Sequence, residues 1–405
     1  MYSAKIKTVL LATAAIFLAG SLMVFPKESL EASIRGMTMW WDVVFPSLLP
    51  FFIVSELLIG FGVVTFIGAI LEPLMRPLFR VPGVGGFVWA MGLASGNPAG
   101  AKLTARLRQE GKVSQIEAER LVSFTNSSNP LFIFGAIAVG FFHNPALGIV
   151  LALAHYLGNI CVGLLFRFHG RQEEASEKKN KSNKLSVKEA LRLLHKERLK
   201  DGRPIGQLLG DAVQSSVKTL LMIGGFIILF SVLNQLLILI GITSILAVFI
   251  SIILTFFNLP SDLSIPFISG IFEITLGAKK TSESTETALL DQIIITSFFL
   301  AFSGFSIQAQ VASILAETDI RFKPFFVARI IHGFFAAFIA LLLWEPLYVN
   351  QQSSQEDWGV IPVFLSEKTA AFHPIWELIV QYGSIFTLIM LVIYILLRTN
   401  QALKQ

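Results

Sequence analysis

Six consecutive polar or turn-forming residues interrupt an otherwise apolar stretch of the chain: Thr125, Asn126, Ser127, Ser128, Asn129 and Pro130. Pro130 removes one backbone donor and loosens the turn before it. Exposed amide and carbonyl groups, together with the asparagine side chains, would form a surface that coordinates a small polar solute. The alternative is that these side chains only hold helices together, since Ser and Asn bond across helix interfaces in membranes. The length of the run favours a solute site.

A second polar turn, Ser95-Gly96-Asn97-Pro98, has the same character. Its glycine permits close approach of the backbone, and a helix that starts after the turn could direct its N-terminus at an anion. The alternative is a tight turn that binds nothing. We expect Ser95, Gly96 and Asn97 to contribute to the same site as the run at 125–129.

Glu273 is a carboxylate among Ile, Phe and Leu residues. Ionisable residues in apolar segments are costly and mark ion or solute pathways. Glu273 could couple protons or bind a cation; the alternatives are an ion pair with a buried arginine or an interfacial position. The neighbouring candidates are Thr275 and, on the next apolar segment, Ser303, Ser306, Gln308 and Gln310.

Arg329 lies in a later apolar segment and could pair with Glu273 or with an anionic solute. The alternative is snorkelling to the cytoplasmic surface, because Arg329 follows Lys323 closely. The histidines are scattered without metal-ligand spacing, and the single cysteine, Cys161, cannot form a disulfide framework. The sequence contains no HExxH or GxSxG motif and no usefully spaced carboxylate pair. We therefore predict that the protein binds no metal or cofactor and is not an enzyme.

Composition places these residues in a membrane protein. The chain has 54% hydrophobic and 15% charged residues, whereas a soluble chain carries about 25% charge. A helix needs about 20 apolar residues to cross the hydrocarbon. The crossings predicted on this basis are about 8–25, 43–62, 121–142, 146–168, 216–240, 291–312, 325–345 and 376–397.

Two further apolar segments, 83–101 and 259–278, contain too many Gly and Pro residues for continuous spans. Lipid cannot satisfy the backbone groups that such residues free, so these segments must be buried in protein or line a wet cavity. We expect each to be a re-entrant hairpin, and we expect 63–79 and 242–257 to lie in the interface. The predicted fold is an all-α polytopic membrane protein with about eight transmembrane helices and two hairpins.

Charge predicts the orientation. With these spans, the basic flanks of the first hairpin, the loop at 169–213 and both termini fall on one side. Basic loops mark the cytoplasmic side, so both termini are predicted to be cytoplasmic. Within the loop, a capping-box pattern at 186–189 predicts a short basic amphipathic helix that rests on anionic lipid.

The two halves of the chain share an order of motifs. Gly100-Ala101-Lys102 recurs as Gly277-Ala278-Lys279, and three further pairs keep offsets of about 169–178 residues. Repeats of this kind decide the architecture. Each unit would have three crossings, so the second copy would be inverted, as in many secondary transporters. The predicted regions are 1–41, the first repeat at 42–168, the linker at 169–213, the second repeat at 214–346, and an outer loop with a last helix at 347–405.

Four stretches carry a resemblance to a known family: GLASGNPAGAK at 92–102, SFTNSSNPLFIFG at 123–135, SGIFEITLGAK at 269–279 and AFSGFSIQAQ at 301–310. The chain resembles the sporulation integral membrane protein family of YlbJ type, which carries the Gate, or nucleoside-recognition, domain. The resemblance implies residence in the cell membrane and a role in sporulation, in particular in making the spore cortex. It does not supply a transported substrate.

These observations predict a transporter or permease for a small polar solute that is needed during spore envelope formation. The alternative is a membrane scaffold or receptor that organises cortex synthesis. The expected partners are the lipid bilayer, an unidentified small polar solute, and either a second copy of the chain or another sporulation protein. The net charge of +5 is spread over the loops between spans and does not indicate a nucleic-acid partner.

Overall fold

The computed structural model describes residues 2–171 and 187–350, with a few isolated positions near the C-terminus. Contacts group Met1–Gln351 into one compact unit and Gln352–Gln405 into another, and every helix below belongs to the first. Over the described residues all regular elements are helices and no strand is present, which confirms the all-α prediction. Most of the predicted crossing at 376–397 and most of the loop at 346–374 lie outside the described residues.

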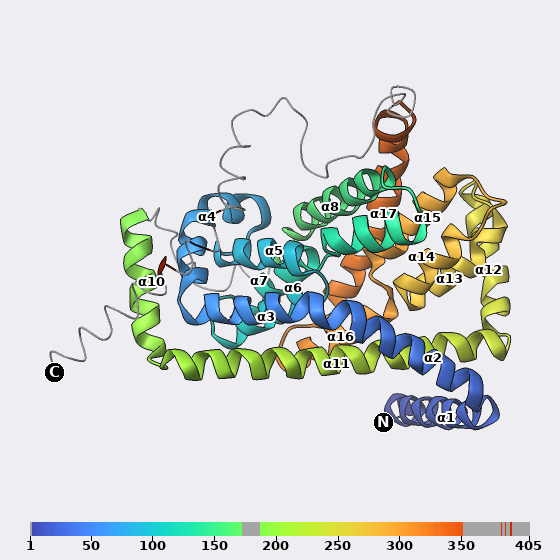
Figure 1. The fold of residues 1–405 in the computed structure, drawn as a ribbon, viewed down its shortest axis with the longest axis horizontal. Helices are drawn as coiled ribbons and strands as arrows, with labels where there is room; N and C mark the ends of the chain where they lie inside the picture. The colour runs from blue at the N-terminus through green and yellow to red at the C-terminus, as the bar shows by residue number, and fades with distance from the viewer. Residues whose placement is uncertain (1, 172–186, 351–381, 383–384, 386–388, 391–405) are drawn as a thin grey trace. The chain divides into compact units, whose positions relative to one another are not determined.

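The first half of the chain forms mostly short helices (Figure 1). They are α1 (Tyr2–Val24), α2 (Pro26–Met39), the π-helical η1 (Trp40–Val44), α3 (Phe45–Gly60), α4 (Val63–Phe79), α5 (Val84–Ser95), α6 (Ala99–Gln109), α7 (Gln115–Thr125), the π-helical η2 (Leu131–Phe141) and α8 (Leu147–Phe166).

The linker helix and the second half follow in a similar order. They are α10 (Val187–Asp201), α11 (Ile205–Leu239), α12 (Ile242–Phe256), the 3-10 turn η3 (Ser261–Leu263), α13 (Ser264–Phe272), α14 (Ile274–Ser282), α15 (Leu289–Phe302), α16 (Gly304–Leu315), α17 (Phe322–Trp344) and the π-helical η4 (Glu345–Val349).

Several helical segments are long and apolar enough to cross a membrane. Within the part of the chain that the structure describes, four meet this test by length and composition: Leu147–Phe166, Ile205–Leu239, Leu289–Leu315 and Phe322–Val349. Two bent helix pairs raise the number to six if each pair is one span. These helices support a multi-pass membrane protein, while the total of about eight crossings stays a prediction.

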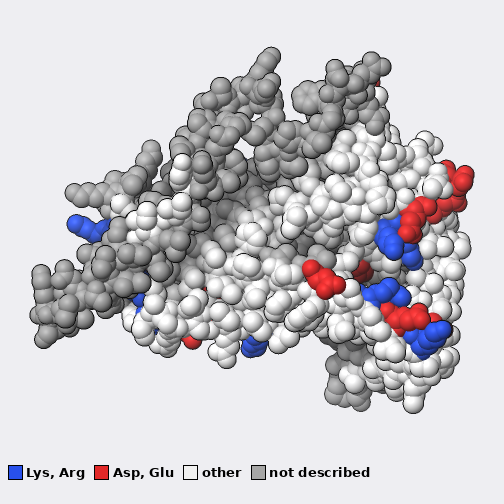
Figure 2. Space-filling model, in the orientation of Figure 1, with Lys and Arg blue, Asp and Glu red and all other residues white. Residues whose placement is uncertain are grey.

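The surface agrees with a lipid environment. On the face shown in Figure 2, most of the described surface carries no charged side chain. Large apolar side chains are exposed on several helices, among them Leu221 on α11, Phe249 on α12 and Phe338 on α17. Contiguous apolar surface of this kind is unfavourable in water and is expected where a helix faces lipid.

The long helix α11 lies alongside α2 and α3 (Figure 1). The indole of Trp40 donates a hydrogen bond to the carbonyl oxygen of Leu220 at 2.9 Å, and the Ser231 hydroxyl donates to that of Ala32 at 2.7 Å. The helix that contains the predicted crossing at 216–240 is longer than that crossing, because it extends unbroken from Ile205. Residues 205–215 are more polar than the rest but contain no proline to stop a helix.

Each Gly- and Pro-rich segment folds into a pair of short helices, α5 with α6 and α13 with α14. A Cβ added at Gly277 would lie 2.1 Å from the Cα of Gly270, and one at Gly92 or Gly100 would lie 2.2 Å from the carbonyl oxygen of Thr125. Only glycine allows backbones to come this close. The predicted helix breaks are confirmed, whereas the re-entrant placement of the pairs in a membrane stays a prediction.

Two large apolar clusters form the interior of the unit. The first packs Phe79 and Phe124 of the first half with Val311 and Leu315 of the second. The second cluster likewise combines residues of η2 and α8 with residues of α13, α14 and α15. Because both clusters draw on both halves, packing brings the interrupted helices of the two halves together.

The charged linker contains α10, which packs against α4. Glu197 of α10 forms an ion pair with Lys112 at 3.3 Å. Gly62, at the corner between α3 and α4, has a left-handed φ of 77°, and a Cβ there would lie 2.8 Å from the carbonyl oxygen of Leu194. The predicted amphipathic helix is therefore present, but one of its faces packs on the protein, which the sequence pattern did not predict.

Candidate functional site

A cavity of about 420 Å³ lies where the tips of the two helix pairs meet the two interrupted helices. Most of the predicted site residues line it: Ser95, Gly96, Asn97, Ser128, Asn129, Glu273, Thr275, Ser306 and Gln310. They come from the α5–α6 turn, the break between α7 and η2, the α13–α14 turn and the first turns of α16. The structure thus brings polar residues from both halves of the chain to one cavity.

The remaining wall of the cavity is apolar. It is formed by residues of α2, η1, α3, η2, α11, α14 and α16: Met39, Val44, Leu48, Leu131, Phe132, Ile223, Ile227, Ile274 and Ile307. A mostly apolar cavity with a few convergent polar groups is the usual form of a small-molecule site. The apolar wall can contact the nonpolar part of a solute, and the polar groups can fix its orientation.

Asn129 connects the first helix pair to the break in the next helix. Its side-chain amide donates to the carbonyl oxygen of Ser95 at 3.1 Å, and its side-chain oxygen accepts from the backbone N–H of Phe132 at 2.8 Å. The second bond satisfies a free donor in the first turn of η2. Gly96 is required beside it, because φ is 87° and a Cβ would lie 3.1 Å from the backbone nitrogen of Asn129.

Glu273 forms the turn of the second helix pair. Its extended backbone, with φ −147° and ψ 119°, separates α13 from α14. The carboxylate accepts hydrogen bonds from the backbone N–H groups of Thr275 at 3.1 Å and Leu276 at 2.8 Å. Glu273 therefore caps α14, where a negative charge is favoured by the helix dipole, and also lines the cavity.

Arg329 lies behind the first break and does not line the cavity. Its side chain is fully buried, and it donates to the carbonyl oxygens of Asn126 at 2.7 Å and of Ser123, and to the side chain of Asn159 at 3.1 Å. The predicted pairing with Glu273 is wrong, and so is the alternative of snorkelling to the surface. The guanidinium instead satisfies carbonyl groups that the end of α7 leaves without intrahelical partners.

The first three residues of the predicted polar run also lie behind the cavity. Thr125 donates back to the carbonyl oxygen of Leu121 at 2.9 Å. Asn126 and Ser127 are fully buried, and their side-chain polar atoms have no hydrogen-bond partner among the described residues. Only Ser128 and Asn129 of the run line the cavity.

Residues of α8 hold the break in place. The backbone N–H of Ser128 donates to His155 Nε2 at 3.0 Å, and the Tyr156 hydroxyl donates to the carbonyl oxygen of Ser128 at 3.1 Å. Asn159 donates to the carbonyl oxygen of Phe124 at 2.6 Å. The prediction did not include these residues in the site. The sequence feature that could have identified them is the presence of polar side chains one turn apart in an apolar segment.

The second break is shorter than the first. Ser303 has φ 70° and separates α15 from α16. Gln308 is buried and donates to the carbonyl oxygen of Phe302 at 3.0 Å. Ser306 and Gln310, one turn apart on α16, line the cavity, whereas Ser303 and Gln308 do not.

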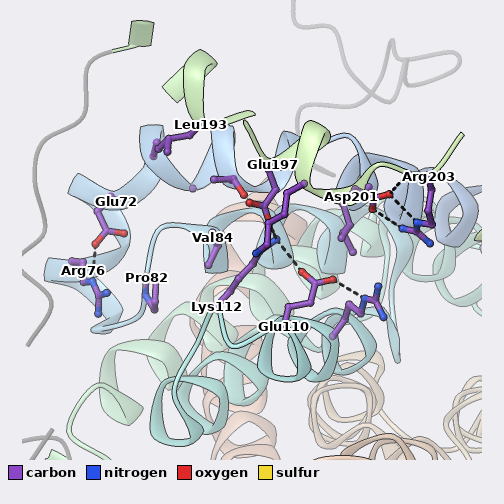
Figure 3. Close-up of a pocket in the computed structure, with 17 residues that line it drawn as sticks. Glu72, Arg76, Pro82, Val84, Glu110, Lys112, Leu193, Glu197, Asp201 and Arg203 are labelled. Atoms are coloured by element: carbon purple, nitrogen blue, oxygen red, sulfur yellow. Dashed lines mark hydrogen bonds and ion pairs between the residues drawn. The ribbon is translucent and has the colours of Figure 1, made fainter. Parts of the chain in front are cut away.

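A larger cavity of about 810 Å³ lies between α10, α4 and α6 (Figure 3). Its lining is strongly charged, and ion pairs join Arg76 to Glu72 at 2.7 Å and Lys112 to Glu110 at 2.9 Å. Arg203 donates to Asp201 at 2.7 Å, which lowers the pKa of that carboxyl. These charged side chains largely pair with one another. We therefore interpret them as contacts that hold α10 against the protein and not as a solute site. The sequence pattern did not predict this cavity.

The chemistry of the candidate site is that of reversible hydrogen bonding and of one carboxylate. No group of three or more His, Cys, Asp or Glu side chains that could hold a metal ion occurs in residues 2–171 and 187–350 or at the isolated positions. The arrangement offers hydroxyl, amide and carboxylate groups to a solute of a few hundred Å³ or less.

Comparison with known proteins shows the family. The family described as nucleoside recognition (Gate) matches residues 41–158 and 220–321, which include both helix pairs and both breaks. The chain is 59% identical over 398 residues, covering 98% of this chain and 97% of the relative, to the sporulation integral membrane protein YlbJ of Bacillus subtilis (strain 168). No solved structure matches the chain. With polar breaks in both halves, a Gate match over more than half its length and this near full-length identity, the chain belongs to the YlbJ family of sporulation integral membrane proteins.

Proposed function

We propose that this protein is a transporter or permease that moves a small polar solute through the cavity between the two helix breaks. The observation that carries the proposal is that Ser95, Asn97 and Asn129 from one half and Glu273 and Ser306 from the other line a single cavity. A solute there would contact both halves at once. Relative movement of the halves would then change the side from which the solute is reached.

The order of the helices supports an inverted repeat. In each half a long helical segment, over 26–60 or 205–239, precedes a shorter helix, a pair of short helices, an interrupted helix and an unbroken one. The paired helices contain at most 12 residues, about 18 Å of helix, which is too short to cross about 30 Å of hydrocarbon. They fit re-entrant hairpins that enter and leave on one side, so each half crosses an odd number of times and the copies are inverted.

The proposed orientation places both termini in the cytoplasm. It rests on the basic residues that flank the first helix pair, such as Arg80 and Lys112, and on the basic linker. The name of the Bacillus subtilis relative supports a role in sporulation, and the family resemblance supports a specific role in spore cortex formation. The solute would therefore be one that the developing spore envelope requires.

The proposal can be tested with the charge-removing change Glu273→Gln in a Bacillus subtilis strain that lacks its own relative. The amide oxygen of Gln can still accept a hydrogen bond at the start of α14, so the fold is retained while the charge is lost. We expect cortex formation and heat-resistant spore numbers to fall about tenfold or more, since a hydrogen bond to a charged group contributes about 1.5–3 kcal/mol. Glu286→Gln, on an exposed carboxylate, should have no effect at equal membrane abundance.

A membrane scaffold or receptor is the competing function. In that case the cavity residues would be dispensable, and the linker that contains α10 would carry the activity. Normal spores from Glu273→Gln and from Asn97→Ala, both at residues that line the cavity, combined with a loss of spores when 187–201 is replaced by a neutral helix, would favour the scaffold and reject transport.

A further inference from the structure

A third cavity, of about 450 Å³, lies where the end of α8 meets the start of α17. Its polar lining consists of His169, Arg321 and Lys323, and none of the described residues that line it is acidic. Its apolar lining consists of Leu165, Phe166, Pro324, Val327 and Ile331. The cavity is therefore divided into a basic part and an apolar part.

The division follows the expected boundary of the membrane. The apolar segment Leu147–Phe166 ends at this cavity, and the apolar segment Phe322–Val349 begins there. The polar residues stand at that boundary, whereas Val327 and Ile331 lie one and two turns further into the apolar segment. Leu165 and Val327 are 46% and 39% exposed, so the apolar part opens onto the surface that faces lipid.

A buried carboxylate positions two of the polar groups. Glu119 is fully buried, and it accepts hydrogen bonds from Arg321 Nε at 2.7 Å and Nη2 at 2.9 Å and contacts His169 Nε2 at 2.7 Å. This contact fixes Arg321 and His169 in the wall of the cavity. Lys323 forms no ion pair with any described residue, so its ammonium group can pair with an anion in the cavity.

We propose that this cavity binds one anionic phospholipid, with its phosphate against His169, Arg321 and Lys323 and an acyl chain along Leu165, Val327 and Ile331. Basic pockets between membrane helices near the cytoplasmic surface recognise anionic headgroups. The apolar part selects a lipid over a free phosphate ion, because only the lipid also buries hydrocarbon there. This site is separate from the central cavity and does not depend on the transport proposal.

The test uses the full chain purified in detergent and delipidated in steps, with bound phosphatidylglycerol and phosphatidylcholine counted by native mass spectrometry. We expect one phosphatidylglycerol to be retained after phosphatidylcholine is lost. Lys323→Gln should weaken that retention about fivefold, as expected for one lysine near an anionic headgroup. Lys279→Gln removes an equally exposed lysine of α14 and should leave retention unchanged.

A second variant separates a lipid from a phosphate ion. Val327→Trp fills the apolar part of the cavity without changing its charge, and it should abolish the retention of phosphatidylglycerol. Equal retention of the two lipids, or unchanged retention in Lys323→Gln, would overturn the proposal. It would also be overturned if inorganic phosphate at millimolar concentration stabilised the protein as much as phosphatidylglycerol and did so equally in Val327→Trp.

Discussion

At the scale of single residues, the interior of this protein uses side chains to replace backbone hydrogen bonds that the helix breaks remove. Arg329 donates to carbonyl oxygens at the end of α7, His155 accepts from the backbone of Ser128, and Glu273 caps α14. Each unpaired buried group would cost about 1–3 kcal/mol. The polar residues in these apolar segments therefore stabilise the interrupted backbone, and the same interruption exposes other polar groups to the cavity.

Removal of the buried guanidinium tests this account. Arg329→Met leaves the carbonyl oxygens of Ser123 and Asn126 without their donor, and we expect a loss of roughly 2–4 kcal/mol in stability. The thermal unfolding midpoint in one fixed detergent is the measurement.

Arg35 supplies the matched control for that change. It forms an exposed hydrogen bond with Gln235 at 3.1 Å, so Arg35→Met should cost less than about 1 kcal/mol. Equal midpoints for the two variants would show that Arg329 does not support the break.

At the scale of elements, the corresponding helix corners at Gly62 and Gly241 have nearly the same backbone dihedral angles but different neighbours. Gly62 has φ 77° and ψ 8° at the start of α4, and Gly241 has φ 78° and ψ 1° at the start of α12. A Cβ at Gly62 would lie 2.8 Å from the carbonyl oxygen of Leu194 in α10, whereas no atom of a described residue lies within 4 Å of one at Gly241. Only the first corner therefore serves as a docking point for another helix.

This pair allows the docking of α10 to be measured. Gly62→Ala and Gly241→Ala both introduce a left-handed alanine, at a cost of about 1–2 kcal/mol each. Only Gly62→Ala should also displace α10, which we expect to appear as faster hydrogen exchange in 187–201. If exchange in α10 rises equally in both variants, the corner does not hold the linker helix.

At the scale of the whole molecule, ion pairs join the two halves beside the α16–α17 turn. Arg108 of α6 bonds Asp319 through two nitrogens at 2.8 and 2.7 Å, and Glu119 of α7 bonds Arg321. Burial by itself raises the pKa of Glu119, but hydrogen bonds from His169 and Arg321 outweigh it and hold the pKa below its ordinary value of 4.5. The folded protein therefore binds this proton more weakly than the unfolded chain does.

The lowered pKa predicts how stability depends on pH. The contribution of Glu119 should be complete above pH 4.5 and should be lost as the pH falls below that value toward the folded-state pKa. Glu119→Gln should lower stability at pH 7 by roughly 1–3 kcal/mol. The lower part of this range is expected, because Arg321 is partly exposed and solvent screens its charge. The difference from the natural protein should shrink as the pH is lowered, which unfolding midpoints measured between pH 7 and pH 4 would show. A constant difference over that range would contradict the assignment.

Much of the candidate site could be predicted because its cause is local. Gly, Pro and small polar residues in apolar segments cannot continue a helix that lipid would tolerate, so the break at 126–130, the turn at Gly96 and an interruption within 259–278 followed from residue types alone. The position of the second turn, at Glu273, did not. The N-terminal end of α11 could not be predicted in the same way. Its first turns are polar, so apolar composition does not mark where the helix begins.

The sequence by itself determined that this protein is helical, that it belongs in a membrane, and where its helices are interrupted, because composition and backbone sterics act over a few residues. Tertiary structure alone decided which polar groups meet. Ser128 faces the cavity while Ser127 does not, and Arg329 pairs with carbonyl groups and not with Glu273. These outcomes depend on which surfaces of distant helices pack together. The periodicity of a sequence predicts on which face of its helix a side chain lies, but not which other helix that face will contact.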